Sequence, residues 1–237
     1  ADQHDRPVGR LDDRLQIASH FFHAEIAVGR PGRFSQAGQV PDDQAEPARQ
    51  IAENAGMEGS SVIAEVKRAS PSKGEFAMHW DPVELAQIYQ DNGAAAVSVL
   101  TEVAHFHGAP EFIRRMRPEI RIPILRKDFV VDSYQLLETR HAGGDAVLLI
   151  TALLEAGRLR DLRQEAEGLG MEALVEVHDE RELDRALEAG ASLIGVNNRN
   201  LVTLEVSLDV AVGLAPRLPP GILAVAESGI GSGEDLS

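Results

Sequence analysis

Seven short apolar runs recur along the chain from residue 61 onwards, and helix-like stretches separate them. The apolar runs are rich in Val, Ile, Leu and Ala, and they cover residues 62–66, 95–100, 122–125, 146–150, 173–177, 193–196 and 222–226. The helix-like stretches cover residues 82–92, 111–117, 133–142, 157–168, 181–189 and 208–215. Strands that alternate with helices predict βαβ units and a parallel sheet. Because the runs are almost continuously apolar, we expect a sheet that is covered on both faces or closed on itself.

Polar residues stand at the C-terminal end of nearly every predicted strand. They are Glu65 and Lys67, Thr101 and Glu102, Lys127 and Asp128, Thr151, Glu176 and His178, Asn197 and Arg199, and Glu227 and Ser228. A dinucleotide-binding sheet would need Gly-x-Gly-x-x-Gly after the first strand, where residues 70–74 read Ser-Pro-Ser-Lys-Gly. A barrel, in contrast, builds its site from many strand ends at one face. We therefore expect an α/β fold, a (β/α)8 TIM barrel truncated before its eighth βα unit, with two open sheet edges.

The first sixty residues show a weaker pattern. Apolar residues at helical spacing predict a helix over residues 10–28, and they are Leu11, Leu15, Ala18, Phe22 and Ile26. A stretch rich in Ala, Gln and Glu predicts a second helix over residues 42–55. We therefore divide the chain into an N-terminal, partly helical extension at residues 1–60 and a TIM-barrel catalytic domain at residues 61–237 that holds strands 1 to 7.

Composition excludes several classes of function. Apolar residues make up 43% of the 237 residues, but no run approaches the roughly 20 that a membrane span needs. A net charge of -15 argues against nucleic acid or an anionic membrane, although positive groups inside a cleft still allow an anionic small molecule. The chain lacks Cys and a secretory signal, so we expect a cytoplasmic location. His105 and His107 lack a third ligand at a telling spacing, and we expect no metal.

Only three of the 23 basic residues are lysines, and this rarity singles them out. Arg cannot exchange a proton near neutral pH, whereas Lys can. Lys67 and Lys127 each follow an apolar strand, so we favour a catalytic function for both, while Lys73 is as easily explained by chance. Glu65 lies two residues before Lys67, and residues two apart on a strand share a face. The pair therefore points to one side of the sheet.

Three further strand ends carry candidate residues. Glu65 and Glu176 are carboxylates that can serve as acid or base in a pocket of low dielectric, although ion pairs with strand-end cations would also explain them. Asn197 and Arg199 suit a substrate that bears a carboxylate or hydroxyl group. Residues 227–230, Glu-Ser-Gly-Ile, end a strand in a glycine turn whose backbone amides can cradle an anion.

Seven ordered segments resemble the indole-3-glycerol-phosphate synthase family of tryptophan biosynthesis. They are VIAEVKRASPSKG at residues 62–74, VSVLTE at 97–102, PILRKDF at 123–129, DAVLLI at 145–150, ALVEVH at 173–178, IGVNNRNL at 194–201 and AESGI at 226–230. The resemblance implies a carbon–carbon lyase that closes an indole ring with loss of CO2 and water and needs no metal or organic cofactor. Its substrate is a small phosphorylated molecule, 1-(2-carboxyphenylamino)-1-deoxyribulose 5-phosphate.

The resemblance also implies roles for individual residues. Lys127 matches the family's general acid, Lys67 and Glu176 match residues of the dehydration step, and Glu65 supports them. The positions that match substrate contacts are Ser70, Phe129, Asn197, Arg199, Glu227 and Ser228. Gly229 matches part of the phosphate site. The family completes that site with a Gly-Ser pair after strand 8, which lies beyond this chain, and residues 1–58 do not resemble the family's N-terminal extension.

Three alternatives remain open at this point. A phosphoribosylanthranilate isomerase would be expected to use a Cys and an Asp, and the chain has no Cys. A Schiff-base aldolase would leave two glutamates and a second lysine unexplained. A partial barrel of the same family would be weak or inactive and would associate through its open edges. An active enzyme of the family, in contrast, is expected to be a monomer.

Overall fold

The computed structural model describes residues 24–28, 61–70, 74–75 and 81–229. Its strands are β1 Ala24–Val28, β2 Ser61–Val66, β3 Ala69–Ser70, β4 Gly74–Glu75, β5 Ala96–Leu100, β6 Ile124–Lys127, β7 Ala146–Ile150, β8 Glu172–Val177, β9 Leu193–Asn197 and β10 Leu223–Glu227. Its helices are α3 Pro82–Asp91, α4 Glu111–Met116, α5 Ser133–Ala142, α6 Ala156–Gly168, α7 Glu180–Glu188 and α8 Asp209–Leu214, with short 3-10 turns η1 Thr151–Leu153 and η2 Ala215–Arg217. The predicted alternation of strands and helices is therefore confirmed.

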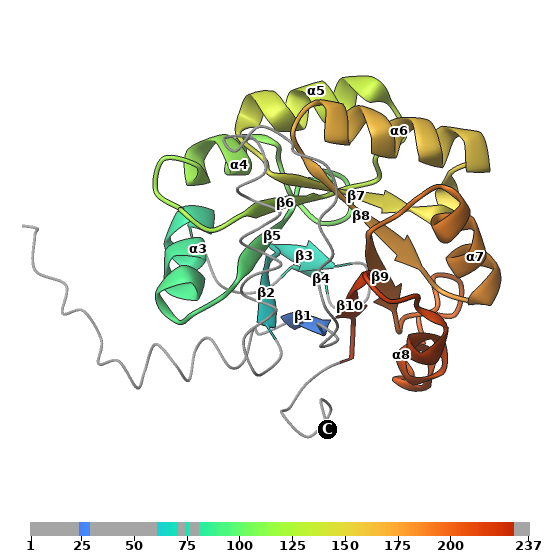
Figure 1. Ribbon diagram of the computed structural model, residues 1–237. Helices are drawn as coiled ribbons and strands as arrows, with labels where there is room; N and C mark the ends of the chain where they lie inside the picture. Colours follow the sequence, from blue (N-terminus) through green and yellow to red (C-terminus); the bar gives the residue numbers. More distant parts are fainter. Residues whose placement is uncertain (1–23, 29–60, 71–73, 76–80, 230–237) are drawn as a thin grey trace, which may run out of the picture.

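Seven of the strands are the parallel strands of a curled sheet. β2, β5, β6, β7, β8, β9 and β10 pair in that order, each parallel to the next. Helices α3 to α8 lie outside these strands, from one side of β1 round to the other (Figure 1). The seven-stranded α/β barrel expected from the sequence is therefore present.

The expectation of two open sheet edges is wrong, because β1 fills the gap between the first and last parallel strands. It pairs antiparallel with β2 on one side, Ala24 opposite Ala64, and antiparallel with β10 on the other, Val28 opposite Ala224. The barrel is therefore closed. Both neighbouring strands would otherwise expose unpaired backbone groups, and pairing them removes that cost.

Residues 24–28 were expected to end a helix over residues 10–28, and this part of the prediction is wrong. The segment reads Ala-Glu-Ile-Ala-Val, and its β-branched residues suit a strand. A helical spacing of apolar residues is local, whereas the two sheet edges lie far away in the sequence, so tertiary pairing overrides the local pattern. The remainder of that helix and the helix predicted over residues 42–55 lie outside the described residues.

Local signals at the helix ends agree with the sequence. Asp132 caps α5 by accepting from the Tyr134 amide at 2.8 Å, and Gln135 completes a capping box. The same helix ends at Gly143, which has a φ of 92°. Glycine adopts this left-handed conformation without the steric strain that a side chain would cause. None of the helices in the described ranges is long and apolar enough to cross a membrane.

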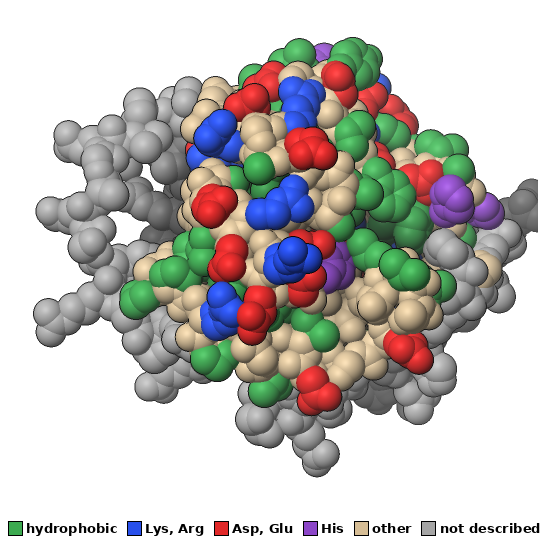
Figure 2. All heavy atoms as spheres, turned by 90° about the vertical axis from the view of Figure 1, so that its right-hand side faces the viewer, with side chains coloured by type: hydrophobic (Ala, Val, Ile, Leu, Met, Phe, Trp, Pro, Cys, Tyr) green, Lys and Arg blue, Asp and Glu red, His purple; other side chains and the backbone are tan. Residues whose placement is uncertain are grey.

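The outer face of the helices carries both signs of charge. Figure 2 shows acidic and basic side chains interspersed over the side of the molecule that carries α7 and α8. On this side Arg217 from η2 forms ion pairs with Glu180 and Asp184 of α7. Exposed pairs of this kind contribute little to stability, and they mark a solvated surface.

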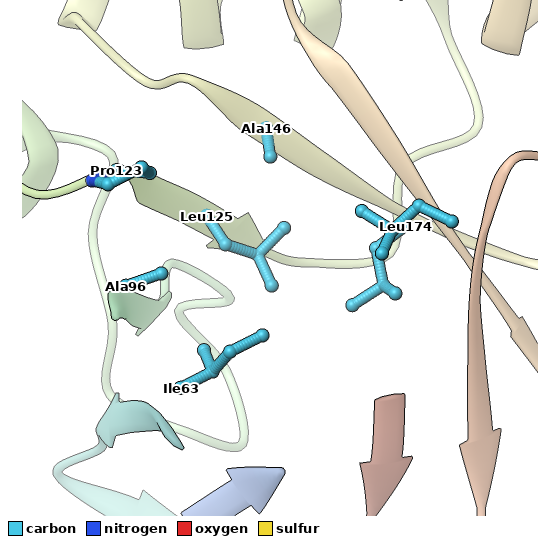
Figure 3. Close-up of a pocket in the computed structure, with 7 residues that line it drawn as sticks. Ile63, Ala96, Pro123, Leu125, Ala146 and Leu174 are labelled. Atoms are coloured by element: carbon cyan, nitrogen blue, oxygen red, sulfur yellow. The ribbon is translucent and has the colours of Figure 1, made fainter. Parts of the chain in front are cut away.

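Two apolar layers hold the barrel together because neighbouring residues of a strand face opposite sides. The residues that face outwards, such as Val147, Leu149 and Val175, pack under the helices. The residues that face inwards at the start of the strands fill the barrel itself. A small apolar cavity of about 10 Å³ remains there (Figure 3), lined by Ile63, Ala96, Pro123, Leu125, Ala146, Leu174 and Leu193. The residues that line this cavity are therefore all apolar.

Candidate functional site

The other end of the barrel is polar. Going along the inward face of several strands, an apolar residue that lines the cavity is followed two positions later by a polar one, as in Ile63 and Glu65, Leu125 and Lys127, and Leu174 and Glu176. The residues that this alternation brings to the C-terminal ends of the strands are Glu65 on β2, Lys67 just after β2, Lys127 on β6, Glu176 on β8, Asn197 on β9 and Glu227 on β10. Five strands therefore contribute to one cluster.

Alternating charges connect the first half of the cluster. Lys67 donates to Oε1 of Glu65, and Oε2 of the same carboxylate lies 3.4 Å from the Nζ of Lys127. Lys127 in turn donates to Oε2 of Glu227 at 3.1 Å. The two lysine side chains are only 15% and 16% exposed, so water screens these contacts weakly. The expectation that Glu65 and Lys67 share a face is thus confirmed, and Lys127 joins them.

Glu227 is fully buried in the cluster. Burial raises the pKa of its carboxyl group to about 7, with Lys127 opposing the rise and Glu176 adding to it. Its Oε1 has no hydrogen-bond partner among the described residues. Room for this oxygen exists because residue 195 is a glycine: a Cβ there would lie 2.0 Å from Oε1. Sequence analysis did not identify Gly195. The only signal in the sequence is its position inside a strand, where a glycine often marks a place at which another group approaches the backbone closely.

Glu176 is also buried, yet it is held in the ionised form. Burial acts to raise the pKa of Glu176, but His178, Lys127 and Asn197 outweigh burial and lower it below its ordinary value. Glu176 and Glu227 thus have carboxyl groups whose pKa values are pushed apart. Pairs of this kind supply the acid and base of an active site.

Arg126 supports the end of β6 from outside the barrel, and sequence analysis gave it no function. Its guanidinium group is 4% exposed and contacts Asp128 at 2.9 Å and Glu138 at 2.7 Å. Asp128 accepts from the hydroxyl of Thr101 at 2.6 Å and from the amide of Phe129 at 2.8 Å. Arg126 and Asp128 thus form an ion pair beside the end of β6.

Three further predicted residues lie in segments that follow strands of the barrel. Phe129 is 45% exposed on the loop that follows Lys127. Ser70 lies in β3, which pairs with β4 as a small antiparallel hairpin after β2. Arg199 is half-buried and donates to the carbonyl of Leu204 at 3.0 Å, which turns its side chain towards its own loop. Within the described part of the chain, the hydrogen bonds of Arg199 go to Asn197 and Leu204 and not to the lysines.

Ser228 and Gly229 follow β10 in an unusual backbone conformation, with φ of 64° and 82°. Gly229 packs so closely against Val206, in the loop between β9 and α8, that a Cβ at residue 229 would lie 2.5 Å from a methyl group of Val206. The side chain of Asn198 donates to the Ser228 carbonyl at 3.1 Å and accepts from the Ala211 amide at 3.0 Å. Asn198 therefore holds the strand end against α8, a role that the pair of adjacent asparagines in the sequence did not reveal.

Metal ligation finds no support in the described residues, where no group of three His, Asp or Glu side chains is placed to hold an ion. The cluster instead combines the ammonium groups of two lysines with three carboxyl groups. Glu65 contacts both lysines, Glu176 has a lowered pKa, and the pKa of Glu227 is raised to about 7. Such a set can hold an anion, protonate an oxygen and remove a proton.

Known proteins resemble this chain over most of its length. The family model described as "Indole-3-glycerol phosphate synthase" matches residues 24–237. Curated relatives of that name are 45% identical over 214 residues in Chlorobium limicola, 53% over 176 residues in Carboxydothermus hydrogenoformans and 54% over 178 residues in Mycolicibacterium gilvum. These alignments cover 90%, 74% and 75% of this chain and 83%, 67% and 65% of the relatives.

Proposed function

Because the chain belongs to the indole-3-glycerol phosphate synthase family, we propose that it converts 1-(2-carboxyphenylamino)-1-deoxyribulose 5-phosphate into indole-3-glycerol phosphate, CO2 and water. The observation that carries the proposal is the convergence of Lys67, Lys127, Glu65, Glu176 and Glu227 at one end of the barrel. Each step of this reaction moves a proton or stabilises an anion, and the cluster offers groups for both.

Ring closure is the step assigned to Lys127. The aromatic carbon that bears the carboxylate attacks the ketone carbon, and the electron pair of the C=O bond moves to oxygen. A proton from Lys127 to that alkoxide completes the step, and a donor that is already in place costs no reorganisation. Glu65 and Glu227, at 3.4 and 3.1 Å from the ammonium group, hold it inside the barrel.

Lys67 and Glu176 are assigned to the later steps. Lys67 pairs with the substrate carboxylate before CO2 leaves, and the electron pair of that bond returns to the ring system. In the dehydration step, Lys67 donates a proton to the leaving hydroxyl group, which departs as water, and a base takes the proton lost from the ring. Glu176 suits the base because its pKa is lowered despite burial, and Glu65 supports Lys67 by its direct contact.

Substrate contacts are assigned to the rim of the cluster. The proposed residues are Ser70, Phe129, Asn197, Arg199, Glu227 and Ser228, with Gly229 at the phosphate. Two successive residues with positive φ turn their amides in one direction, and such a turn suits an anion. Phe129 is exposed enough to stack on the anthranilate ring.

The chemistry requires no metal or organic cofactor, and we propose none. We propose a cytoplasmic monomer without a nucleic-acid partner, in keeping with a biosynthetic enzyme for a small molecule. The expected association through open edges loses its basis because β1 pairs with both of them. An isomerase that relies on a catalytic Cys is not favoured, since the chain has none.

The test is to incubate the purified chain with the carboxyphenylamino-deoxyribulose phosphate and to follow indole fluorescence. We expect activity from the parent and a loss of at least about a hundredfold in Lys127→Met. Arg114→Met is the matched control, since it removes one positive charge from an exposed ion pair on α4. A parent that melts cooperatively but forms no indole would refute the activity of this chain.

A further inference from the structure

His178 lies between two carboxylates at the edge of the site, and the reaction described above leaves it without a role. Its Nδ1 is 2.9 Å from Oε2 of Glu182, and its Nε2 is 3.2 Å from Oε1 of Glu176. Glu176 belongs to β8 and Glu182 to the first turn of α7. The imidazole ring therefore connects a buried group of the site with the helix outside the barrel.

Glu182 fixes which nitrogen of the ring carries a proton. Its Oε2 accepts from the backbone amide of His178 at 2.9 Å as well as from Nδ1. Glu182 is itself held in place because its amide donates to the α7 cap residue, Asp179, at 2.9 Å. Since Glu182 is an acceptor, Nδ1 must be the donor.

The second nitrogen then faces a requirement of its own. If the ring were neutral with its proton on Nδ1, Nε2 would direct a lone pair at the carboxylate of Glu176 only 3.2 Å away. Both groups are largely shielded from water, so this repulsion would be strong. A second proton on Nε2 converts it into an attraction. Nε2 is not aligned for a hydrogen bond with any described residue in this state, and contacts of this kind tighten when substrate binds.

The charged surroundings support this protonation state. Among the described residues, Glu176 and Glu182 are the charged groups in contact with His178. On the far side of Glu176 lie Lys127 from β6 and Glu227 from β10. The η1 turn, which packs on both α7 and β8, reads Thr-Ala-Leu and carries no charge.

We propose that His178 is a positioning residue that holds Glu176 in place as an ionised base, with Glu182 as the anchor of its ring. The proposal rests on the proposed function in so far as Glu176 serves as the base of dehydration. Burial alone would lower the pKa of His178, but Glu176 and Glu182 outweigh it and raise the pKa to about 10. The His178 cation is the first of the contacts that lower the pKa of Glu176.

The first measurement uses the resting protein without substrate. Glutamate side chains are labelled with ¹³C, and the carboxyl signal of Glu176 is identified by its loss in Glu176→Gln. We expect Glu176 to titrate at a higher pH in His178→Gln than in the parent, and Glu182→Gln to shift it in the same direction. Glu180→Gln, two residues away on an exposed ion pair of the same helix, leaves the titration unchanged. An unaltered titration of Glu176 in His178→Gln overturns the proposal.

The second measurement is the pH dependence of kcat/KM. In His178→Gln the acid limb moves to higher pH, so that kcat/KM below neutral pH falls about tenfold or more, because a nearby cation favours the carboxylate. KM changes little, since His178 does not contact substrate, and Glu180→Gln keeps the parent profile. A parent without activity refutes the proposed function, while the carboxyl titration still decides the role of His178.

Discussion

The buried guanidinium group of Arg126 predicts a large loss of stability on its removal. On the outward face of β6 it donates from Nε to Thr101 at 3.1 Å and from Nη1 to Thr139 at 3.2 Å, besides its ion pairs with Asp128 and Glu138. The variant Arg126→Met keeps an unbranched apolar chain of similar length but deletes the charge and all of these donors. Two carboxylates and two hydroxyl groups lose a partner at once.

The size of the loss follows from how well water can replace the guanidinium group. Removing one partner of a buried ion pair costs about 3–5 kcal/mol. Glu138 is 32% exposed and regains water, whereas Asp128 is 11% exposed and does not. We therefore expect the lower end, about 3 kcal/mol. For a chain of this size that corresponds to a fall in Tm of roughly 6–12 °C.

The assay is urea unfolding of the parent and three variants, followed by circular dichroism. Arg114→Met is the control, because its ion pair with Glu111 is more than half exposed on both sides and contributes at most about 1 kcal/mol. In the double variant Arg126→Met with Asp128→Asn, part of the loss returns because the stranded charge is gone. A cost for Arg126→Met no larger than that for Arg114→Met would refute the reasoning.

Two further substitutions test the site and a helix end. Gly195→Ala places a Cβ 2.0 Å from Oε1 of Glu227, so we expect the carboxylate to be displaced and formation of indole-3-glycerol phosphate to fall by up to about a hundredfold. The control is Gly168→Ala, whose Cβ meets open space and leaves activity intact. Equal activity in both variants would contradict the prediction. Asp132→Ala removes the N-terminal cap of α5, and we expect the free energy of unfolding in urea to fall by about 1 kcal/mol. Glu155→Ala is the control, and it changes this free energy very little because Glu155 makes no side-chain cap bond on α6. Equal losses in the two variants would argue against the cap.

The repeating part of the fold is predictable because its signals are local. An apolar run followed by a helical period and a glycine is complete within about 30 residues, as in residues 124–143. Strand alternation also predicts that Glu65 and Lys67 share one face of the sheet. The closure by β1 is different, since the strand forms where β2 and β10 leave unpaired edges. Nothing within residues 24–28 describes those edges.

Partnerships across the barrel are harder to predict than positions. Strand ends place Lys127 in the cluster, but the contact with Glu227, 100 residues away, depends on how the barrel curls. The same holds for Gly195, because its lack of a side chain leaves room for the carboxylate of Glu227 from the neighbouring strand. His178 was visible as a strand-end residue, but its partner Glu182 sits on a helix and was assigned to no site.

The scarcity of lysine singles out Lys127, and the end of β6 shows how its surroundings differ from those of the neighbouring arginine. Arg126 and Lys127 are neighbours that face opposite sides of one strand, and each cation fits its place. Outside the barrel, the planar fork of Arg126 meets several acceptors at fixed angles and keeps its charge permanently. Inside, Lys127 is a compact ammonium group between two carboxylates, and a lysine can release a proton. Exchange of the two residue types would leave acceptors outside the barrel unmatched and would place inside it a guanidinium group that does not release a proton near neutral pH. The two neighbouring cations thus have different surroundings, with several acceptors around the guanidinium group outside the barrel and two carboxylates around the ammonium group inside it.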